Sequence, residues 1–294
     1  MERLNDPVLE HEEGFVFVQM ADPQFGAFAS LSGMDETEIE SRRRRGLIVR
    51  PAPRTEGFSA ETVLYERAVA AANRIAPDFV VVCGDMVNDA DDADQLEEVW
   101  RITRQLDDGI SVHWVAGNHD LYNRFTTESL AMYRQRFGED NYSFEHRGSS
   151  FIVLNSSIFF DPSEIRDEWE RQLVFLRRSL EKARGTGSNH IIVFTHHPLF
   201  VKDPEEDEDP PLIMVPRERR RVLLDLLLAY GVSAVFAGHW HRNNYASYGR
   251  LQMVTSGSVG YPLGYDPSGI RVVRVFADRI EHEYVPIDDP PADS

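Results

Sequence analysis

The sequence predicts an α/β protein, because short apolar runs alternate along the chain with amphipathic runs of helical spacing. Most of the first seven apolar runs are hydrophobic nearly throughout, as expected for strands that are covered on both faces. The last two runs, joined near Ala277-Asp278-Arg279, predict a closing antiparallel hairpin. The predicted strands are Phe15–Met20, Phe79–Cys83, Val112–Ala116, Ser150–Asn155, Ile191–Thr195, Ala234–Ala237, Leu251–Thr255, Ile270–Phe276 and Ile280–Tyr284.

Three helices are predicted from stripes of apolar residues on one face. The first begins at a cap on Ser59 and ends just before Pro77. The second contains the stripe from Trp169 to Leu180. The third contains the stripe from Val222 to Tyr230 and ends at Gly231. These stripes are typical of helices that pack on a core.

Composition and charge exclude several classes of function. The 294 residues are 42% hydrophobic and 27% charged, which is enough to form a large core. The formal net charge of −18 argues against non-specific binding to nucleic acid or to an anionic membrane, because either would require an extended basic face. Cys83 is the one cysteine, which excludes a disulfide framework and a Cys-rich metal cluster. Residues Met1 to Gly14 show no signal-peptide pattern and no apolar run is long enough to span a membrane, so we expect a cytoplasmic protein.

We expect one domain over residues 1–294, because neither a repeat nor a linker divides the chain. Long insertions are expected at about 23–58 and 201–216. The first contains the run Arg42-Arg43-Arg44-Arg45 and the second contains the acidic run 203–209. Both runs are typical of solvated loops, and this is the favoured interpretation of the acidic run. For the arginine run the alternative is a contribution to recognising an anionic substrate. The arginine run follows the strand that ends at Asp22, so the base of its loop should lie beside any site formed there.

Side chains that bind metals follow five of the predicted strands. They are Asp22, Asp85, Asn118, His196, His239 and His241. Strands of an open α/β sheet present their carboxyl ends to one ligand crevice, so we expect these side chains to converge. Carboxylate, amide and imidazole donors without a thiolate suit Mn, Fe or Zn. Six ligands are too many for one four-coordinate ion but fit two ions that share a carboxylate, an arrangement suited to phosphoryl displacement.

The ordered motifs resemble those of the calcineurin-like metallophosphoesterase family, D-x-H, G-D, G-N-H-[DE], H and G-H-x-H. Here they read Asp22-Pro23-Gln24, Gly84-Asp85, Gly117-Asn118-His119-Asp120, His196 and Gly238-His239-Trp240-His241. Three segments are most similar to the family's cytosolic single-domain branch, namely Met20 to Gly26, Leu154-Asn155-Ser156 and Gly238 to Asn243. The resemblance implies a four-layer α/β/β/α sandwich of two mixed sheets.

The resemblance also implies a role for each motif residue. One ion would be held by Asp22, Asp85 and His241, and the other by Asp85, Asn118, His196 and His239. His119 would approach the phosphate or the leaving-group oxygen and would be oriented by Asp120, and a metal-bridging hydroxide would be the nucleophile. These roles are chemically reasonable, because a metal lowers the pKa of bound water towards about 7 and histidine donates protons near neutral pH.

Gln24 departs from the family pattern, which has histidine at that position. A glutamine carbonyl binds a hard cation more weakly than imidazole does, or only holds a metal-bound water, so we expect a weakened first site. The candidates for substrate binding are Asn118, His119, Arg242 and His197, with Asn88 and Tyr261 as weaker ones. For Arg242, an ion pair with an acidic neighbour is an equal alternative. For His197, a role in the turn before Pro198 is slightly favoured.

The favoured function is a metal-dependent phosphomonoesterase that acts on a phosphoprotein or on a small phosphorylated metabolite. A phosphodiesterase acting on a cyclic nucleotide or a glycerophosphodiester ranks second, because Gln24 departs from the D-x-H usual in the family's cyclic-nucleotide enzymes. A catalytically weak metal- or phosphate-binding module ranks third. The pair His119-Asp120 argues against that module, since binding alone needs no proton donor.

Overall fold

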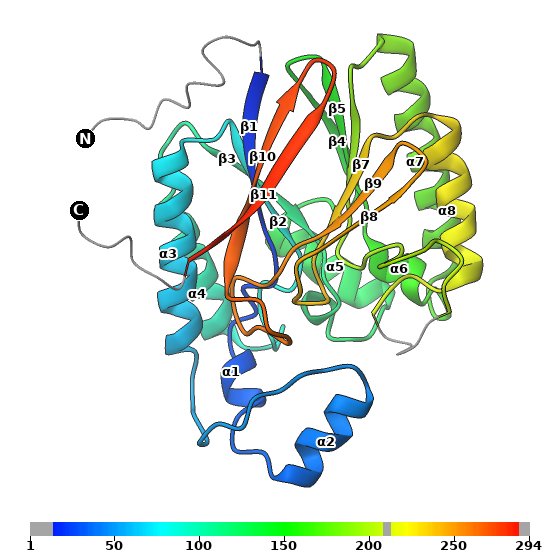
Figure 1. The fold of residues 1–294 in the computed structure, drawn as a ribbon. Helices are drawn as coiled ribbons and strands as arrows, with labels where there is room; N and C mark the ends of the chain where they lie inside the picture. The colour runs from blue at the N-terminus through cyan, green and yellow to red at the C-terminus, as the bar shows by residue number, and fades with distance from the viewer. Residues whose placement is uncertain (1–13, 208–212, 288–294) are drawn as a thin grey trace.

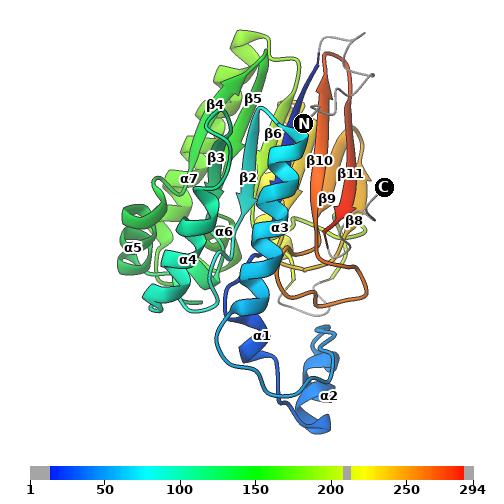
Figure 2. The ribbon, with the colours of Figure 1, turned by 90° about the vertical axis from the view of Figure 1, so that its left-hand side faces the viewer.

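A computed structural model describes residues 14–207 and 213–287 and shows two sheets packed face to face between layers of helices (Figures 1 and 2). Both sheets are mixed, with parallel strands at their centres and antiparallel pairs at their edges. The predicted four-layer α/β/β/α sandwich is therefore confirmed.

The first sheet has the strand order β11-β10-β1-β2-β3. Its members are β1 (Gly14–Met20), β2 (Phe79–Cys83), β3 (Ser111–Val115), β10 (Gly269–Phe276) and β11 (Ile280–Pro286). The parallel strands β1, β2 and β3 end at the same edge, while β10 and β11 form the predicted hairpin. Each of these strands was predicted to within two residues at either end.

The second sheet has the strand order β4-β5-β6-β7-β9-β8. Its members are β4 (Tyr142–His146), β5 (Ser149–Val153), β6 (Ile191–Phe194), β7 (Ala234–Ala237), β8 (Asn244–Tyr248) and β9 (Leu251–Thr255). The edge strands β4 and β8 are additions to the predicted set. Both carry exposed polar residues and pair antiparallel with an apolar neighbour.

Helices cover the outer faces of both sheets, except α1 (Ala27–Ser30) and α2 (Glu36–Arg44), which lie beyond one edge of the sandwich (Figures 1 and 2). The others are α3 (Ser59–Ile75), α4 (Ala93–Thr103), α5 (Thr127–Phe137), α6 (Ser156–Phe160), α7 (Arg166–Thr186) and α8 (Arg217–Ala229), with a 3₁₀ turn η1 at His119–Leu121. The three predicted helices correspond to α3, α7 and α8. Ser59 is the first residue of α3 and not its cap, which is Phe58.

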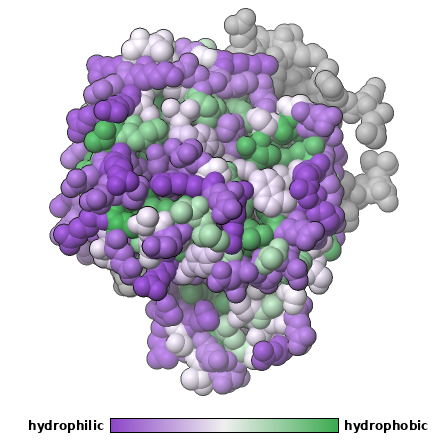
Figure 3. Space-filling model, turned by 180° about the vertical axis from the view of Figure 1, so that it is seen from behind, coloured by the Kyte–Doolittle hydropathy of each residue, from purple (hydrophilic) through white to green (hydrophobic). Residues whose placement is uncertain are grey.

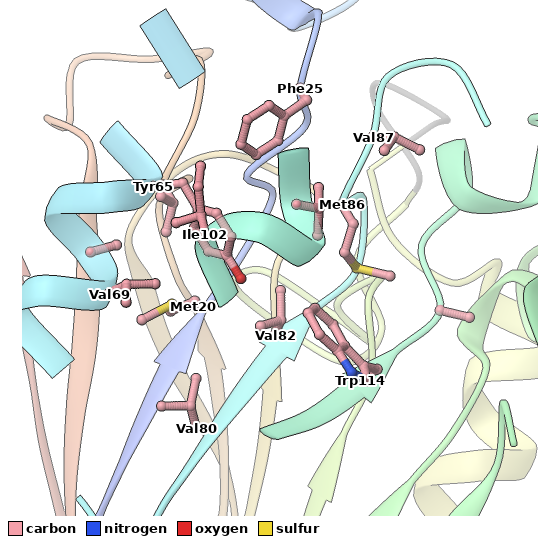
Figure 4. Packing of buried hydrophobic residues seen from close by; sticks show 14 of the residues in the cluster. Met20, Phe25, Tyr65, Val69, Val80, Val82, Met86, Val87, Ile102 and Trp114 are labelled. Carbon is pink, nitrogen blue, oxygen red and sulfur yellow. The ribbon is translucent and has the colours of Figure 1, made fainter. Parts of the chain in front are cut away.

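Three buried clusters correspond to the three interfaces between the four layers. Aromatic residues fill the space between the sheets, where Phe17 stacks on Phe79 and meets Phe194 and Phe236 edge-on. Figure 4 shows the second cluster, in which residues of β1 and β2 pack under Tyr65 of α3. The third cluster joins the second sheet to α6, α7 and α8. These interfaces fix the two sheets against each other and so fix the loops at their shared edge.

The insertion that contains α1 and α2 projects beyond that edge (Figures 1 and 2). From behind, it forms a largely polar extension below the body of the molecule (Figure 3). The second insertion includes residues 208–212, which lie outside the described part. Its described part is anchored to α8, because Arg217 pairs with Glu205 at 2.8 Å and Nη2 of Arg220 donates to the carbonyl of Glu206. No helix in the described ranges is long and apolar enough to cross a membrane.

Candidate metal centre

The predicted metal ligands all follow strands at one edge of the sandwich. They are Asp22 and Gln24 after β1, Asp85 after β2, Asn118 after β3, His196 after β6, and His239 and His241 after β7. Nine described residues other than glycine have a positive φ, and five of them belong to this set. A positive φ is costly for such residues and is characteristic of functional sites. These turns aim the side chains back across the strand ends.

Four of these side chains converge on one point. The Nε2 atom of His196 lies 3.2 Å from Oδ2 of Asp85 and 2.9 Å from Oδ1 of Asn118. The same atom lies 3.0 Å from Nδ1 of His239. The four donors come from four different loops, and they are the set expected for the second ion.

Asp22 and His241 form the other half of the centre. Oδ1 of Asp22 lies 3.4 Å from Nε2 of His241, and its carboxylate also accepts the backbone N–H of His239 at 2.9 Å. Ligand atoms of Asp22, Asp85 and His196 lie within 4.8 Å of one another. Asp85 therefore lies close enough to both halves to be shared between them.

Two of the histidines are held in the tautomer that a metal ligand needs. His196 donates its Nδ1–H to the carbonyl of Cys83 at 2.8 Å, and His241 donates its Nδ1–H to the carbonyl of Tyr261. With Nδ1 protonated, the neutral ring presents the lone pair of Nε2 to the centre. Tyr261 thus contributes through its backbone, and it was predicted only as a weak site candidate.

The electrostatics of the centre call for bound cations. Asp22 and Asp85 are buried, and their only ion-pair partners among the described residues are histidines. Burial opposes ionisation of Asp85, but the charges of His196 and His119 outweigh it and lower its pKa. Burial likewise lowers the pKa of His196, but the charge of Asp85 outweighs it and raises that pKa to about 9. Buried carboxylates that raise the pKa of neighbouring histidines in this way also attract divalent metals.

Two glycines allow the close approach of the ligands. A Cβ atom on Gly117 would collide with the backbone N and Oδ1 of Asp85, and a Cβ on Gly238 would lie 2.6 Å from Oδ2 of Asp22. Gly117 therefore keeps space for a carboxylate that follows the neighbouring strand β2, and Gly238 keeps space for one that follows β1 of the facing sheet. The residues present fit two metal ions.

Asn88 links Gln24 to His119. The Nδ1–H of His119 donates to the carbonyl of Asn88 at 2.8 Å, while the amide nitrogen of Gln24 donates to Oδ1 of Asn88 at 3.4 Å. This arrangement engages the nitrogen of Gln24 and not its carbonyl oxygen, which is the atom that could bind a cation. Asn88 was a weak candidate for substrate contact, and the structure gives it a positioning role instead.

Asp120 has a different role from the predicted one. Its carboxylate accepts backbone N–H groups of Asp85 at 2.8 Å, Met86 at 2.9 Å and Gly117 at 2.9 Å. Asp120 therefore holds together the loops that follow β2 and β3, and the carbonyl of Asn88 orients His119. Burial and then the charge of Asp85 raise the pKa of Asp120 to about 7.

His197 is buried beside the centre. The Oγ atom of Ser156 accepts its backbone N–H at 2.8 Å and lies 3.0 Å from its Nδ1, and its ring stacks on Phe160. Burial and the nearby histidines lower the pKa of His197 well below the usual value. Its contacts support the turn-forming role. Sequence reasoning missed Ser156 as the residue that holds this turn, although the tripeptide Leu154-Asn155-Ser156 was part of the resemblance.

Arg242 forms no ion pair with an acidic residue in the described part of the chain, so that one of its two predicted roles is not observed. Its guanidinium donates to the carbonyls of Leu263 at 3.2 Å and Gly46 at 2.7 Å, and it lies over the ring of Trp240. Burial lowers its pKa. Arg242 therefore connects the last metal motif to the first insertion.

Comparison with known proteins agrees with this geometry. The family profile of calcineurin-like phosphoesterases matches residues 18–243. The serine/threonine-protein phosphatase CPPED1 of Homo sapiens is 35% identical over 287 residues, covering 94% of this chain and 84% of that protein. A solved dimetal phosphatase from Danio rerio has a TM-score of 0.63 at 18% identity and covers 92% of this chain and 95% of its own. A purple acid phosphatase from Lupinus luteus has a TM-score of 0.65 at 12% identity, covering 95% of this chain and 52% of its own.

The fold and the donor set define a dinuclear metal-dependent hydrolase of phosphate esters. The chain belongs to the calcineurin-like phosphoesterase family. The resemblance of the sequence motifs to that family is thereby confirmed.

Proposed function

We propose that this chain is a phosphomonoesterase whose two metal ions are held at the candidate metal centre and whose residues form one catalytic domain. The observation that carries the proposal is the convergence of six metal-binding side chains from five strand ends. Asp22, Asp85 and His241 would hold one ion, and Asp85, Asn118, His196 and His239 would hold the other. Gln24 would support the first ion weakly.

When bound, two such ions supply positive charge that polarises a phosphoryl group and activates a water molecule for attack. The nitrogen and oxygen donors, without a thiolate, support Mn, Fe or Zn in this role. We expect the first site to bind its metal ion with lower affinity, because Gln24 offers a neutral amide where the family pattern has an imidazole. We place the enzyme in the cytoplasm, which a single buried cysteine supports.

His119 would donate a proton to the departing oxygen. Its ring is only partly buried, and its Nδ1–H is held by the carbonyl of Asn88, which leaves Nε2 as the atom that faces a leaving group. Its backbone N–H also binds Oδ1 of Asp85 at 2.8 Å, so the proton donor is fixed to the shared carboxylate. A positioned donor of this kind contributes roughly 10²–10⁴-fold to turnover.

The substrate class we propose is a protein phosphorylated on serine or threonine. The CPPED1 relatives, named as serine/threonine-protein phosphatases, support this class because the similarity covers nearly all of the chain. Asn118 and His119 would contact the phosphate. Arg242 and His197, first expected to do so, would shape the walls around it through the contacts described above.

The proposal is tested by comparing three substrates after metal removal and reloading. A phosphoserine peptide, an aryl phosphate and an aryl phosphodiester are assayed with Mn, Fe, Zn and Mg in turn. We expect both monoesters to be hydrolysed only after metal is restored, and faster than the diester. Faster hydrolysis of the diester would favour the phosphodiesterase. Metal binding without turnover of any of the three would favour a binding module.

A further inference from the structure

The first insertion contains a segment of unusual charge. Residues 42–54 include six arginines and no carboxylate, although the whole chain has a formal net charge of −18. Four of these arginines, Arg42 to Arg45, lie at the C-terminal end of α2 and directly after it. Basic residues at that end of a helix interact favourably with its dipole, but each adds only about 0.3–1 kcal/mol and the effect is confined to the last turn. Helix stability therefore explains part of the run and not the whole segment.

This segment is fixed to the rim of the metal centre. The carbonyl of Gly46 accepts Nη2 of Arg242 at 2.7 Å, and the backbone N–H of Arg50 donates to the hydroxyl of Tyr261 at 3.2 Å. Arg242 directly follows His241 in the chain, and the carbonyl of Tyr261 accepts Nδ1–H of that same histidine. The segment is thus joined to a metal-binding residue by two short paths.

An apolar contact makes the attachment firm. Val49 is buried with Ala27 and Tyr261, and Phe28 meets the Tyr261 ring edge-on with their centroids 4.8 Å apart. A backbone hydrogen bond also joins the two segments, from the N–H of Ile48 to the carbonyl of Leu263 at 3.4 Å. The insertion is therefore docked on the rim rather than attached only at its ends.

Several arginine side chains of the segment point to solvent without an acidic partner. Arg44, Arg45 and Arg54 are exposed, and among the described residues the ion pairs of the run are limited to that of Arg43 with Glu40 at 3.2 Å. We refer to Arg42, Arg44, Arg45 and Arg54 together as the arginine face. These four arginines form no ion pair within the described residues, although Asp35, Glu36, Glu38 and Glu40 cap or belong to the same helix.

We propose that the arginine face binds acidic residues that flank the phosphorylated residue of a protein substrate. This inference rests on the proposed phosphatase function and specifies the substrates that the centre receives. α2 projects away from the strand ends (Figures 1 and 2), so we expect a ligand that reaches both the metal centre and the end of α2 to be longer than a small metabolite. An extended peptide advances about 3.3–3.6 Å per residue, so three or four residues beyond the phosphate span roughly 10–14 Å.

Charge also selects this partner. An acidic protein with a net charge of −18 repels acidic partners in general, and the arginine face offers a local exception at the rim of the centre. Because the Debye length is about 8 Å at physiological ionic strength, the nearby arginines outweigh the remote negative surface.

The test compares two phosphoserine peptides, one with aspartates around the phosphoserine and one with alanines there. Arg44→Gln/Arg45→Gln removes two charges while keeping good helix formers. Arg177→Gln/Arg178→Gln, on an exposed stretch of α7, is the matched control for charge removal. We expect the unaltered enzyme and the control to prefer the acidic peptide by about 3- to 10-fold in kcat/KM, a size typical of a few exposed ion pairs. The Arg44/Arg45 variant should lose most of that preference and keep its activity on an aryl phosphate.

A binding measurement separates this inference from the proposed function. A fluorescent acidic peptide without phosphate should bind the unaltered protein more tightly at low than at high salt, and the Arg44/Arg45 variant should bind it weakly at both. Equal binding by the two proteins, or an equal preference in the assay, would overturn the role of the arginine face. Capture of anionic vesicles or of RNA in place of the peptide would also overturn it. Loss of all hydrolysis with intact peptide binding would instead overturn the phosphatase proposal and leave the binding surface supported.

Discussion

Asp120→Asn should destabilise the fold and weaken metal binding, with the loss of activity following from both. Each oxygen of the Asp120 carboxylate accepts two backbone N–H groups. Oδ2 accepts those of Asp85 and Gly117, and Oδ1 accepts those of Met86 and Val87. An asparagine amide replaces one of these oxygens with a nitrogen donor, so two backbone N–H groups lose their acceptor.

The expected cost follows from those two groups. A buried donor left unsatisfied costs about 1–3 kcal/mol, which gives roughly 2–6 kcal/mol for the pair. Removal of the Asp120 charge relieves its repulsion with Asp85, so we expect the lower half of that range. For a chain of this size each kcal/mol shifts Tm by about 2–4 °C, so the melting temperature should fall by roughly 5–15 °C.

The assay measures Tm, metal content and the pH profile of kcat in Asp120→Asn, with the exposed Asp94→Asn as the matched control. We expect a lower Tm and a lower metal content, while the activity that remains in excess metal keeps the pH profile of the unaltered enzyme. An unchanged Tm and full metal content, combined with a kcat as low as that of His119→Asn, would refute this reasoning. That result would restore Asp120 as a catalytic partner of His119.

Three other changes test separate parts of the centre and fold. His119→Asn should lower kcat by roughly 10²–10⁴-fold at full metal content, measured with elemental analysis beside the assay, and an unchanged kcat would remove His119 from the mechanism. Gln24→His should tighten the first metal site and reduce the dependence on added Mn²⁺ in calorimetric titration, whereas equal affinities would show that Gln24 has no coordinating role. Burial and then the charge of His146 lower the pKa of His113 to about 4. The folded state therefore keeps His113 neutral, and stability should fall as the pH decreases from about 6.5 towards 4. His113→Phe, which can keep the stack on Phe144, should show a smaller fall in urea midpoints over that range, and parallel curves for the two proteins would contradict the assignment.

The strands that position the centre could be predicted from the sequence because they are buried on both faces. Continuous apolar runs such as β2 and β7 end at the glycine of each motif, so both the strand and the metal ligand that follows it can be predicted from the sequence. The edge strands β4 and β8 escaped prediction because each is only five residues long and largely exposed, so the alternation of Tyr142 and Phe144 with polar residues in β4 is too short to stand out. Helix α2 escaped for a similar reason, since Ile39 is its one buried residue.

Positioning residues were harder to predict than metal ligands. Asn88 acts on His119 through its backbone carbonyl, and a carbonyl is present whatever the side chain is. Asp120 was recognised from its motif, but its partners are backbone N–H groups that leave no trace in the sequence. The hydrogen-bond partners of Arg242 depend on where the first insertion folds back against the last metal motif. These contacts arise between segments far apart in the chain, and local pattern does not encode them.

The central claim is that one shared carboxylate joins two metal ions at the strand ends, and metal stoichiometry tests it most directly. Elemental analysis of the reloaded protein should give two ions per chain, and Asp94→Asn should match it. Asp85→Asn should lose both ions together, because Asp85 lies within reach of ligand atoms in both halves of the centre. Two ions still bound per chain in Asp85→Asn would contradict the shared-carboxylate account.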